Sequence, residues 1–381
     1  MTNQYALTGD QLAIQDMARK FTADAITPFA AEWDVKKHFP VDVIKRSAQI
    51  GFGGIYVREA SGGIGLGRLE AAIIMEAMAY GCPATSAFIS IHNMAAWMID
   101  SFASDDIKSR YLPDLISMDK IASYCLTEPG SGSDAAALKT TAQRDGDDYV
   151  VSGSKQFISG AGVNDIYVCM VRTGEDGPRG ISCLLVEKDM PGLSFGAPEK
   201  KLGWNASPTA QVHFDNVRVP AANRIGGEGE GFRIAMAGLD GGRINIGACS
   251  LGGAQRCLDE AVAYTKERKQ FGQAIADFQN TQFMLADMAT DLEAARALLY
   301  IAACKVTDNA PDKSRFSAMA KRLATDNGSK IVNDALQLFG GYGYLQDYPI
   351  ERFWRDLRVH SILEGTNQVM RMIVGRDLLR Q

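Results

Sequence analysis

The sequence lacks the features of membrane, nucleic-acid-binding and disulfide-stabilised secreted proteins. No apolar run approaches the roughly 20 residues that span a bilayer, and the start lacks the marks of a signal or transit peptide. Its 40 Lys and Arg are outnumbered by 45 Asp and Glu, so no basic excess favours phosphate backbones. The 7 cysteines form no CxxC pair, which favours free, buried thiols in a reducing compartment. We expect a cytoplasmic protein, or a mitochondrial-matrix one if the chain is a processed eukaryotic product, without membrane, nucleic-acid or metal partners.

Apolar periodicity divides the chain into three parts. A chain of 381 residues is long enough for two or three domains. Residues 1–120 read as helical, beginning with a capping box at Thr8 and Gln11, and residues 121–230 contain short β-rich runs bounded by turns. The pattern predicts an α+β fold with a helical N-terminal domain (1–120), a central β domain (121–230) and a C-terminal helical bundle (231–381). The helical stretches expected in the last part are residues 232–268, 281–309, 314–339 and 368–379.

A Gly- and Ser-rich segment, Tyr124–Asp134, is the first candidate ligand site. Its small residues would let a ligand approach the backbone, and its hydroxyl groups, including that of Ser133, could bind it. Gly130–Ala135 also fits a GxGxxA dinucleotide pattern, but Pro129 precedes the first glycine and no βαβ rhythm follows. A turn at a domain junction is the alternative explanation.

Three further segments are weaker candidates. In Lys155–Gly160, Phe157 could back a flat ring while Ser159 binds its edge, although an ordinary strand would look the same. The basic residues of Glu267–Gly272 could bind a phosphate near a helix end. Alternatively, they could complement the helix dipole without any ligand. Gln337–Tyr344 contains more glycines than one helix C-cap requires.

Glu364 is the candidate general base. It lies between the apolar pair at 362–363 and Gly365, just before a helix that Thr366 would cap. A carboxylate beside apolar residues, without an adjacent cation in sequence, can have a raised pKa that suits proton abstraction near neutral pH. The alternative is an acidic residue favoured by a helix N-terminus.

Together and in this order, these segments resemble the acyl-CoA dehydrogenase family over essentially the whole chain. The resemblance implies a central β-barrel domain, a C-terminal four-helix bundle, FAD as cofactor, electron-transferring flavoprotein as electron acceptor, and a homotetramer in which Arg268, Phe271 and the Gln337 loop reach a neighbouring subunit's FAD. The positions that would bind FAD are Tyr124, Leu126, Thr127, Gly132, Ser133, Phe157, Ile158, Ser159, Arg268, Phe271, Phe278, Gln279, Gln337, Gly340, Gly341, Thr366, Asn367 and Gln368. Those that would contact acyl-CoA are Ser133, Asp240, Gly241, Gly242, Arg243, Gly365 and Arg376.

The same resemblance implies a mechanism. Glu364 would remove an α proton from an acyl thioester while the β hydrogen leaves as hydride to FAD. Some relatives carry the base just before the arginine that corresponds to Arg243, but here that position is Gly242, which leaves Glu364. Gly241 and Gly242 also predict an open approach along their helix that tolerates bulk, so that the length of the acyl pocket would be set elsewhere.

The segments Gly341–Tyr344, Arg355–His360 and Ile362–Arg371 look most like the isobutyryl-CoA dehydrogenase subgroup, with Thr366 and Gln368 as departures. We therefore expect oxidation of isobutyryl-CoA to methacrylyl-CoA, in branched-chain amino acid (valine) or fatty acid catabolism. The alternatives are a short straight-chain or 2-methylbutyryl-CoA dehydrogenase. An acyl-CoA oxidase would be longer, a non-enzymatic flavoprotein would be expected to lose the base, and a nicotinamide enzyme would rest on the GxGxxA match alone.

Overall fold

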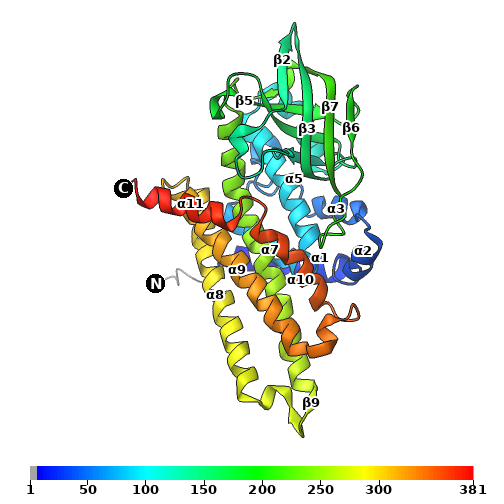
Figure 1. The fold of residues 1–381 in the computed structure, drawn as a ribbon, viewed down its shortest axis with the longest axis vertical. Coiled ribbons are helices and arrows are strands. Elements are labelled where there is room, and N and C mark those ends of the chain that lie inside the picture. The colour runs from blue at the N-terminus through cyan, green and yellow to red at the C-terminus, as the bar shows by residue number, and fades with distance from the viewer. Residues whose placement is uncertain (1–6, 381) are drawn as a thin grey trace.

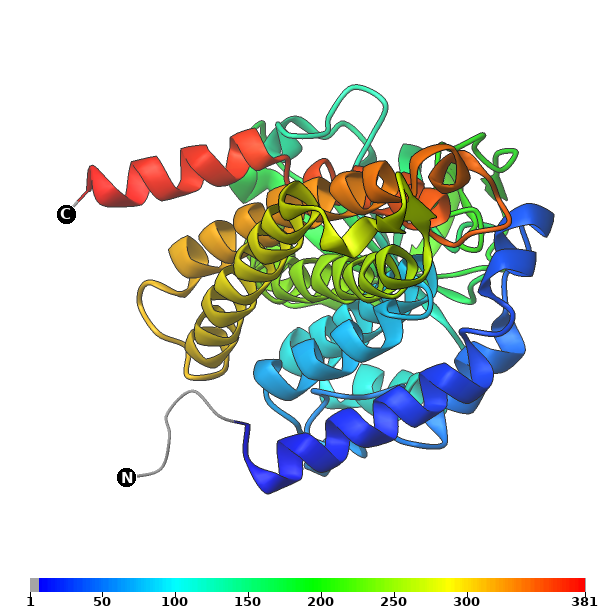
Figure 2. The same cartoon turned by 90° about the horizontal axis from the view of Figure 1, so that it is seen from below.

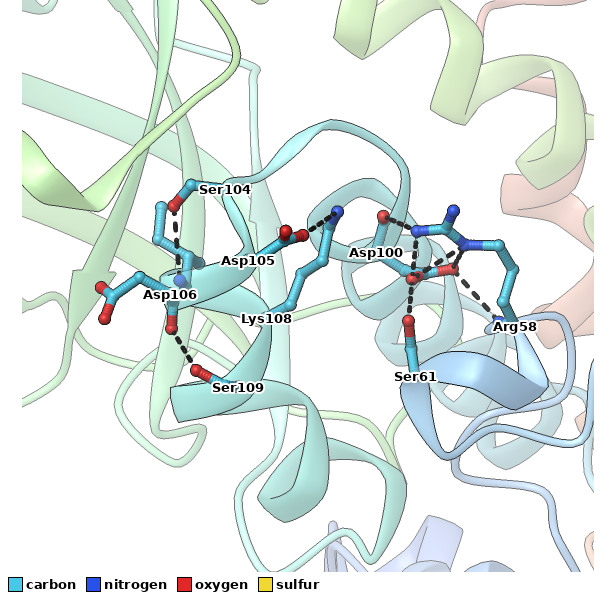
Figure 3. A network of polar contacts seen from close by, with 9 residues as sticks. Arg58, Ser61, Asp100, Ser104, Asp105, Asp106, Lys108 and Ser109 are labelled. Carbon is cyan, nitrogen blue, oxygen red and sulfur yellow. Dashed lines mark hydrogen bonds and ion pairs between the residues drawn. The ribbon is translucent and has the colours of Figure 1, made fainter.

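The computed structural model describes residues 7–380, in which helices flank a β-sheet (Figure 1). Thr8 caps the first helix as predicted: its Oγ1 accepts a hydrogen bond from the Gln11 N–H (3.2 Å), and the Gln11 side chain accepts one from the Thr8 N–H (3.0 Å). Ser104 caps the sixth helix, with Asp105 and Asp106 in its first turn (Figure 3). The helices of this part are α1 (Gly9–Ala25), α2 (Ala30–Lys36), α3 (Val41–Ala48), α4 (Arg68–Ala79), α5 (Pro83–Phe102) and α6 (Asp105–Ile116).

The central sheet has the strand order β6-β7-β3-β2-β4-β5-β8, with β1 added in parallel to β4. Its strands are β1 (Ala122–Cys125), β2 (Thr141–Asp145), β3 (Asp148–Ser159), β4 (Ile166–Arg172), β5 (Ile181–Glu187), β6 (Leu193–Phe195), β7 (Thr209–Pro220) and β8 (Arg224–Ile225). The pairing of β3 with β7 shifts register between Lys155 and Ile158, which marks a bulge at Phe157. Within residues 7–380 the end strands β6 and β8 do not pair, so the expected closed barrel is not confirmed.

Long helices form the C-terminal part. They are α7 (Gly231–Glu267), α8 (Gln279–Thr307), α9 (Lys313–Phe339), α10 (Ile350–Arg358) and α11 (Asn367–Leu378), and the short strands β9 (Lys269–Gln270) and β10 (Gln273–Ala274) make a hairpin after α7. The four expected stretches are confirmed as α7, α8, α9 and α11, whereas α10 was missed. Helices α7, α8 and α9 lie side by side, but α11 projects away from them (Figures 1 and 2) and buries only Asn367 and Met370.

The core joins the two helical parts. Helices α4 and α5 pack on α7, and one cluster of buried apolar side chains extends from α1 through α4 and α7 to α9. Six of the seven cysteines are buried and none forms a disulfide in the described chain, as expected, although Cys304 is exposed. Nowhere in residues 7–380 is a helix both long and apolar enough to cross a membrane. Because α4, α5 and α9 all pack on α7, the middle of α7 is enclosed by helices from both ends of the sequence.

Candidate active site

A left-handed turn presents the candidate base. Glu364 has φ 57° and Gly365 has φ 92°, and α11 begins two residues later with Thr366 as its cap. A Cβ on residue 365 would lie 2.6 Å from the methyl carbon of Met370, which could shift, so the positive φ is the main reason that glycine is favoured there. A non-glycine residue in this conformation costs about 1 kcal/mol or more, and such strain is concentrated at functional sites.

Side chains from two long helices hold this turn in place. Arg243 on α7 donates from Nε to the Glu364 carbonyl (3.2 Å). Lys321 on α9, which is fully buried, donates from Nζ to the Gly365 carbonyl (2.8 Å) and to Oδ1 of Asn367 (2.9 Å). Asn367 in turn donates to Thr325 and Asp326 of α9. The side-chain amide of Asn367 is thus bound within the bundle, and its backbone carbonyl accepts from Arg371 (3.3 Å), so the backbone N–H is the group left for the FAD contact expected from the sequence.

Glu364 is half-buried, and one oxygen of its carboxylate is fully enclosed. Its Oε2 is buried and has no hydrogen-bond partner within residues 7–380. A Cβ on Gly242 would lie only 2.5 Å from this oxygen, so the carboxylate rests directly against the α7 backbone. Burial raises the pKa of Glu364 to about 7, while the cations of Arg243 and Lys321 act in the opposite direction. The carboxyl group can therefore exchange a proton near neutral pH, as the sequence predicted.

Helix α7 brings the predicted acyl-CoA contacts to the same place. Arg243 and Asp240 are both buried and form an ion pair (Nη1 to Oδ1, 2.8 Å), and Asp240 also accepts from the Ser314 hydroxyl (2.6 Å). The expected open approach along the two glycines is wrong. A Cβ on Gly241 would lie 2.4 Å from Nη1 of Arg68, as one on Gly242 would meet Glu364, so both spaces are filled by side chains from other elements.

The two candidate flavin-binding segments of the sheet lie side by side. The Gln156 N–H donates to the Thr127 carbonyl (2.8 Å), and the Ser123 hydroxyl donates to the Ser159 carbonyl (2.7 Å). Phe157, at the bulge of β3, has φ 59° and is 64% exposed. A large aromatic ring held in a strained conformation and left exposed suggests that a ligand covers it.

A buried ion pair supports the first of these segments. Lys155 donates from Nζ to Glu128 (2.7 Å) and to the Leu126 carbonyl (3.2 Å), and Glu128 accepts from the N–H groups of Lys139 and Thr140. Because all these groups are satisfied, the loop after β1 is held firmly against β3.

Tyr124 connects the sheet with the base. Its hydroxyl is buried and has no hydrogen-bond partner among the described residues. Burial raises the pKa of Tyr124 well above its ordinary value, and the negative charge of Glu364 adds to the rise. The end of β1 is therefore within electrostatic reach of Glu364, as a site shared by the sheet and the helices requires.

Other predicted cofactor positions lie far from Glu364. Arg268, Gln337, Gly340 and Gly341 line a surface pocket of about 370 Å³ where α7 and α9 end. At 1.5 Å per helical residue, Arg268 lies roughly 37 Å along α7 from Arg243, which touches Glu364. Phe278 and Gln279 lie at the start of α8, beyond the β9–β10 hairpin whose Phe271 is 94% exposed. The structure thus does not bring these residues together with the base inside one subunit.

Of the remaining candidates, Ile158 is buried in β3 and the others are on the surface. Gly132, Ser133, Gln368 and Arg376 are exposed. The GxGxxA match leads into a three-residue 3-10 helix, Ala135–Ala137, and not into the long helix that a dinucleotide fold needs, so the match does not support the nicotinamide alternative.

Sequence reasoning missed Lys321 and Arg68. Lys321 stands among alanines on a helix, where a lysine is usually solvated, and its burial depends on the turn at Gly365 that it binds. Arg68 did carry a signal, because a cation in the first turn of a helix opposes the helix dipole.

Comparison with known proteins gives a consistent result. The chain matches the families described as acyl-CoA dehydrogenase N-terminal domain (8–119), middle domain (123–217) and C-terminal domain (229–379). It is 57% identical over 373 residues to "Isobutyryl-CoA dehydrogenase, mitochondrial" of Dictyostelium discoideum and 54% identical over 375 residues to that of Bos taurus, covering 98% of this chain and 90% of each relative. Butyryl-CoA dehydrogenase from Megasphaera elsdenii has the same fold (TM-score 0.96, 37% identity, 99% of this chain and 100% of that one). So does PigA, whose structure was solved with FAD and proline (TM-score 0.96, 31% identity, 99% and 100%).

Proposed function

Because the chain belongs to the acyl-CoA dehydrogenase family, we propose that it oxidises isobutyryl-CoA to methacrylyl-CoA with Glu364 as the base. The chain is an FAD-dependent oxidoreductase. The observation that carries the proposal is the buried Oε2 of Glu364, which has no partner in residues 7–380 and belongs to a carboxyl group with a pKa of about 7. A desolvated carboxylate of this kind is suited to removing the weakly acidic α proton of a thioester.

The residues of the sheet fit a flavin. Tyr124 lies in β1, Leu126 and Thr127 follow it, and Phe157 and Ser159 lie beside them on β3. Both the exposed Phe157 ring and the unpartnered Tyr124 hydroxyl call for a ligand. We assign these residues to the isoalloxazine part of FAD. When bound, FAD supplies an acceptor for the β hydrogen of the acyl group, which leaves as hydride.

The chain's own groups control the proton. Arg243 and Lys321 lower the pKa of Glu364 relative to what burial alone would give, so that an ionised fraction exists at neutral pH. The thioester carbonyl needs hydrogen-bond donors as negative charge develops on its oxygen. The backbone N–H of Glu364 makes no hydrogen bond within residues 7–380 and is free to serve as one such donor.

The proposed assembly is a homotetramer in which the pocket lined by Arg268 and Gln337 meets a neighbouring subunit's FAD. The distance of this pocket from Glu364 and the exposure of Phe271 both support that arrangement. We further propose electron-transferring flavoprotein as the acceptor, domain boundaries near residues 120 and 230, and a role in valine or fatty acid catabolism. The compartment would be the bacterial cytoplasm or the mitochondrial matrix.

Substrate preference is tested with four thioesters and an artificial electron acceptor. The identities of 57% and 54% to isobutyryl-CoA dehydrogenases, against 37% to a butyryl-CoA dehydrogenase, support the α-branched substrate. We expect kcat/KM to be highest for isobutyryl-CoA, lower for 2-methylbutyryl-CoA and butyryl-CoA, and nearly zero for octanoyl-CoA. Each methylene that does not fit should cost about 1–3 kcal/mol. A preference for butyryl-CoA would move the protein to the straight-chain group.

A further inference from the structure

Arg68 is a buried cation that the chemistry described above does not use. It is the first residue of α4 and only 6% exposed, and its Nη1 has no hydrogen-bond partner within residues 7–380. Its backbone N–H is satisfied by the Thr307 hydroxyl (2.8 Å), so the donor without a partner belongs to the guanidinium. A buried polar donor without an acceptor costs stability, which calls for an explanation at this position.

Neither the helix dipole nor an ion pair within residues 7–380 stabilises the charge of Arg68. A cation in the first turn of a helix faces the positive end of the helix dipole. Among the described residues Arg68 makes no ion pair, because the nearby carboxylate of Asp240 is bound to Arg243 and Ser314. Burial lowers the pKa of Arg68, and only partial compensation comes from Tyr56 and Asp240.

The surroundings nevertheless hold the guanidinium in one place. Its central carbon lies 3.7 Å from the centre of the Tyr56 ring and 4.9 Å from that of Trp97, which gives cation–π contacts on two rings. The loop that leads to α4 is fixed by the buried Asp100, which binds Arg58 (2.8 Å) and the Ser61 hydroxyl (2.6 Å) as Figure 3 shows. The Arg68 guanidinium is therefore held in a fixed position beside α7 and is not a mobile surface side chain.

Two adjacent glycines relate Arg68 to the base. Nη1 of Arg68 occupies the side-chain space of Gly241, and Oε2 of Glu364 occupies that of Gly242. Each charged group lies within 2.5 Å of the Cβ position of one of two neighbouring helical residues, so the two groups are separated by on the order of 10 Å or less. One turn further along α7, Asn245 donates to the Tyr56 hydroxyl (3.3 Å), and its own Oδ1 is buried without a partner in the described chain.

From this arrangement we infer that Arg68 determines substrate length by forming the closed end of the acyl site. The inference rests on the proposed function, since the reacting α carbon must lie at the Glu364 carboxylate. A short acyl group ends before the polar surface of Arg68, Tyr56 and Asn245, whereas a longer apolar chain would be pressed against a cation and an unpaired donor. Arg68 thus supplies the limit on length that the two glycines of α7 do not.

The test compares Arg68→Ala and Arg68→Leu with Arg296→Ala. Arg296 serves as the control because it is a largely buried arginine that contacts α4 through an ion pair to Glu76 (2.9 Å) and does not lie against Gly241. For each variant kcat/KM is measured with isobutyryl-CoA and octanoyl-CoA, and octanoyl-CoA binding is measured from the change in flavin absorbance. We expect the octanoyl to isobutyryl ratio to rise at least about tenfold in both Arg68 variants, with tighter octanoyl-CoA binding, and to stay within about twofold in the control.

Flavin content and oligomer size are recorded for each variant. If Arg68→Ala does not fold, Arg68→Leu still fills the position with an apolar side chain. The ratio of kcat/KM for octanoyl-CoA to that for isobutyryl-CoA in this variant then tests the inference. An unchanged ratio in a folded, flavin-containing Arg68 variant overturns the inference but leaves the proposed function intact. A wild-type enzyme that prefers octanoyl-CoA overturns both.

Discussion

Replacing Glu364 with glutamine should change stability as well as catalysis. The folded structure raises the pKa of this carboxyl group from an ordinary value of 4.5 to about 7, chiefly by burial. The folded protein therefore binds the proton more tightly than the unfolded chain does. The resulting stabilisation is fully present below pH 4.5 and is lost as the pH rises through about 7. The loss corresponds to roughly 3 kcal/mol for this rise in pKa.

An amide cannot lose a proton, so Glu364→Gln should escape this loss. We expect the variant and the wild type to have similar melting temperatures at pH 5, and the variant to melt on the order of 5 °C higher at pH 8.5. Turnover should fall by several orders of magnitude while FAD and acyl-CoA still bind, because the amide does not accept the α proton. In the wild type, kcat/KM should rise about tenfold per pH unit below pH 7 and level off above it.

The assay is thermal unfolding from pH 5 to pH 9 with saturating FAD, beside steady-state kinetics. Glu175→Gln is the control, since Glu175 is exposed in the loop before β5 and its neutralisation should leave the pH dependence of melting unchanged. If the melting temperatures of Glu364→Gln and the wild type changed with pH in the same way, the argument that burial raises the pKa of the Glu364 carboxyl group would be refuted. Residual turnover above about a tenth of wild type would require another base.

Three further substitutions test the same geometry. Gly242→Ala places a methyl group 2.5 Å from the Glu364 carboxylate, so kcat should fall at least about tenfold with flavin content unchanged; full activity would show that the carboxylate moves freely. Lys321→Met removes a cation that lowers the pKa of Glu364, so the acid limb of the pH–rate profile should move to higher pH, and a shift the other way would contradict the assigned cause. Arg268→Ala should release FAD during gel filtration without altering the melting of an isolated subunit, and undiminished flavin retention would argue against a site shared between subunits.

Local signals in the sequence were sufficient for most of the helices. The capping pair Thr8 and Gln11 is satisfied within four residues, so its outcome does not depend on the rest of the chain. Helices α7, α8 and α9 follow from apolar periodicity over many turns. Helix α10 was missed because it is only 9 residues long and carries charged residues throughout.

The surroundings of the base could not be read from the sequence. Arg243 and Lys321 lie 121 and 43 positions away from Glu364 in the chain, and only the packing of α7 and α9 brings them to the turn. The two glycines of α7 were misread for the same reason, since a missing side chain indicates space without saying what fills it. Apolar periodicity shows which face of a helix is buried, but it does not show which other element packs against that face.

The contact between Gly242 and Glu364 restricts how a base could move during evolution. Resemblance to the family indicates that some members carry the base at the position of Gly242, yet any side chain there would meet Oε2 of Glu364 at 2.5 Å. The carboxylate is the far end of a flexible side chain and can shift, but a side chain at residue 242 would compete with it for the space that it now occupies. We therefore expect a base introduced at residue 242 to displace Glu364 from its present position, so that the two positions would not hold working bases at the same time.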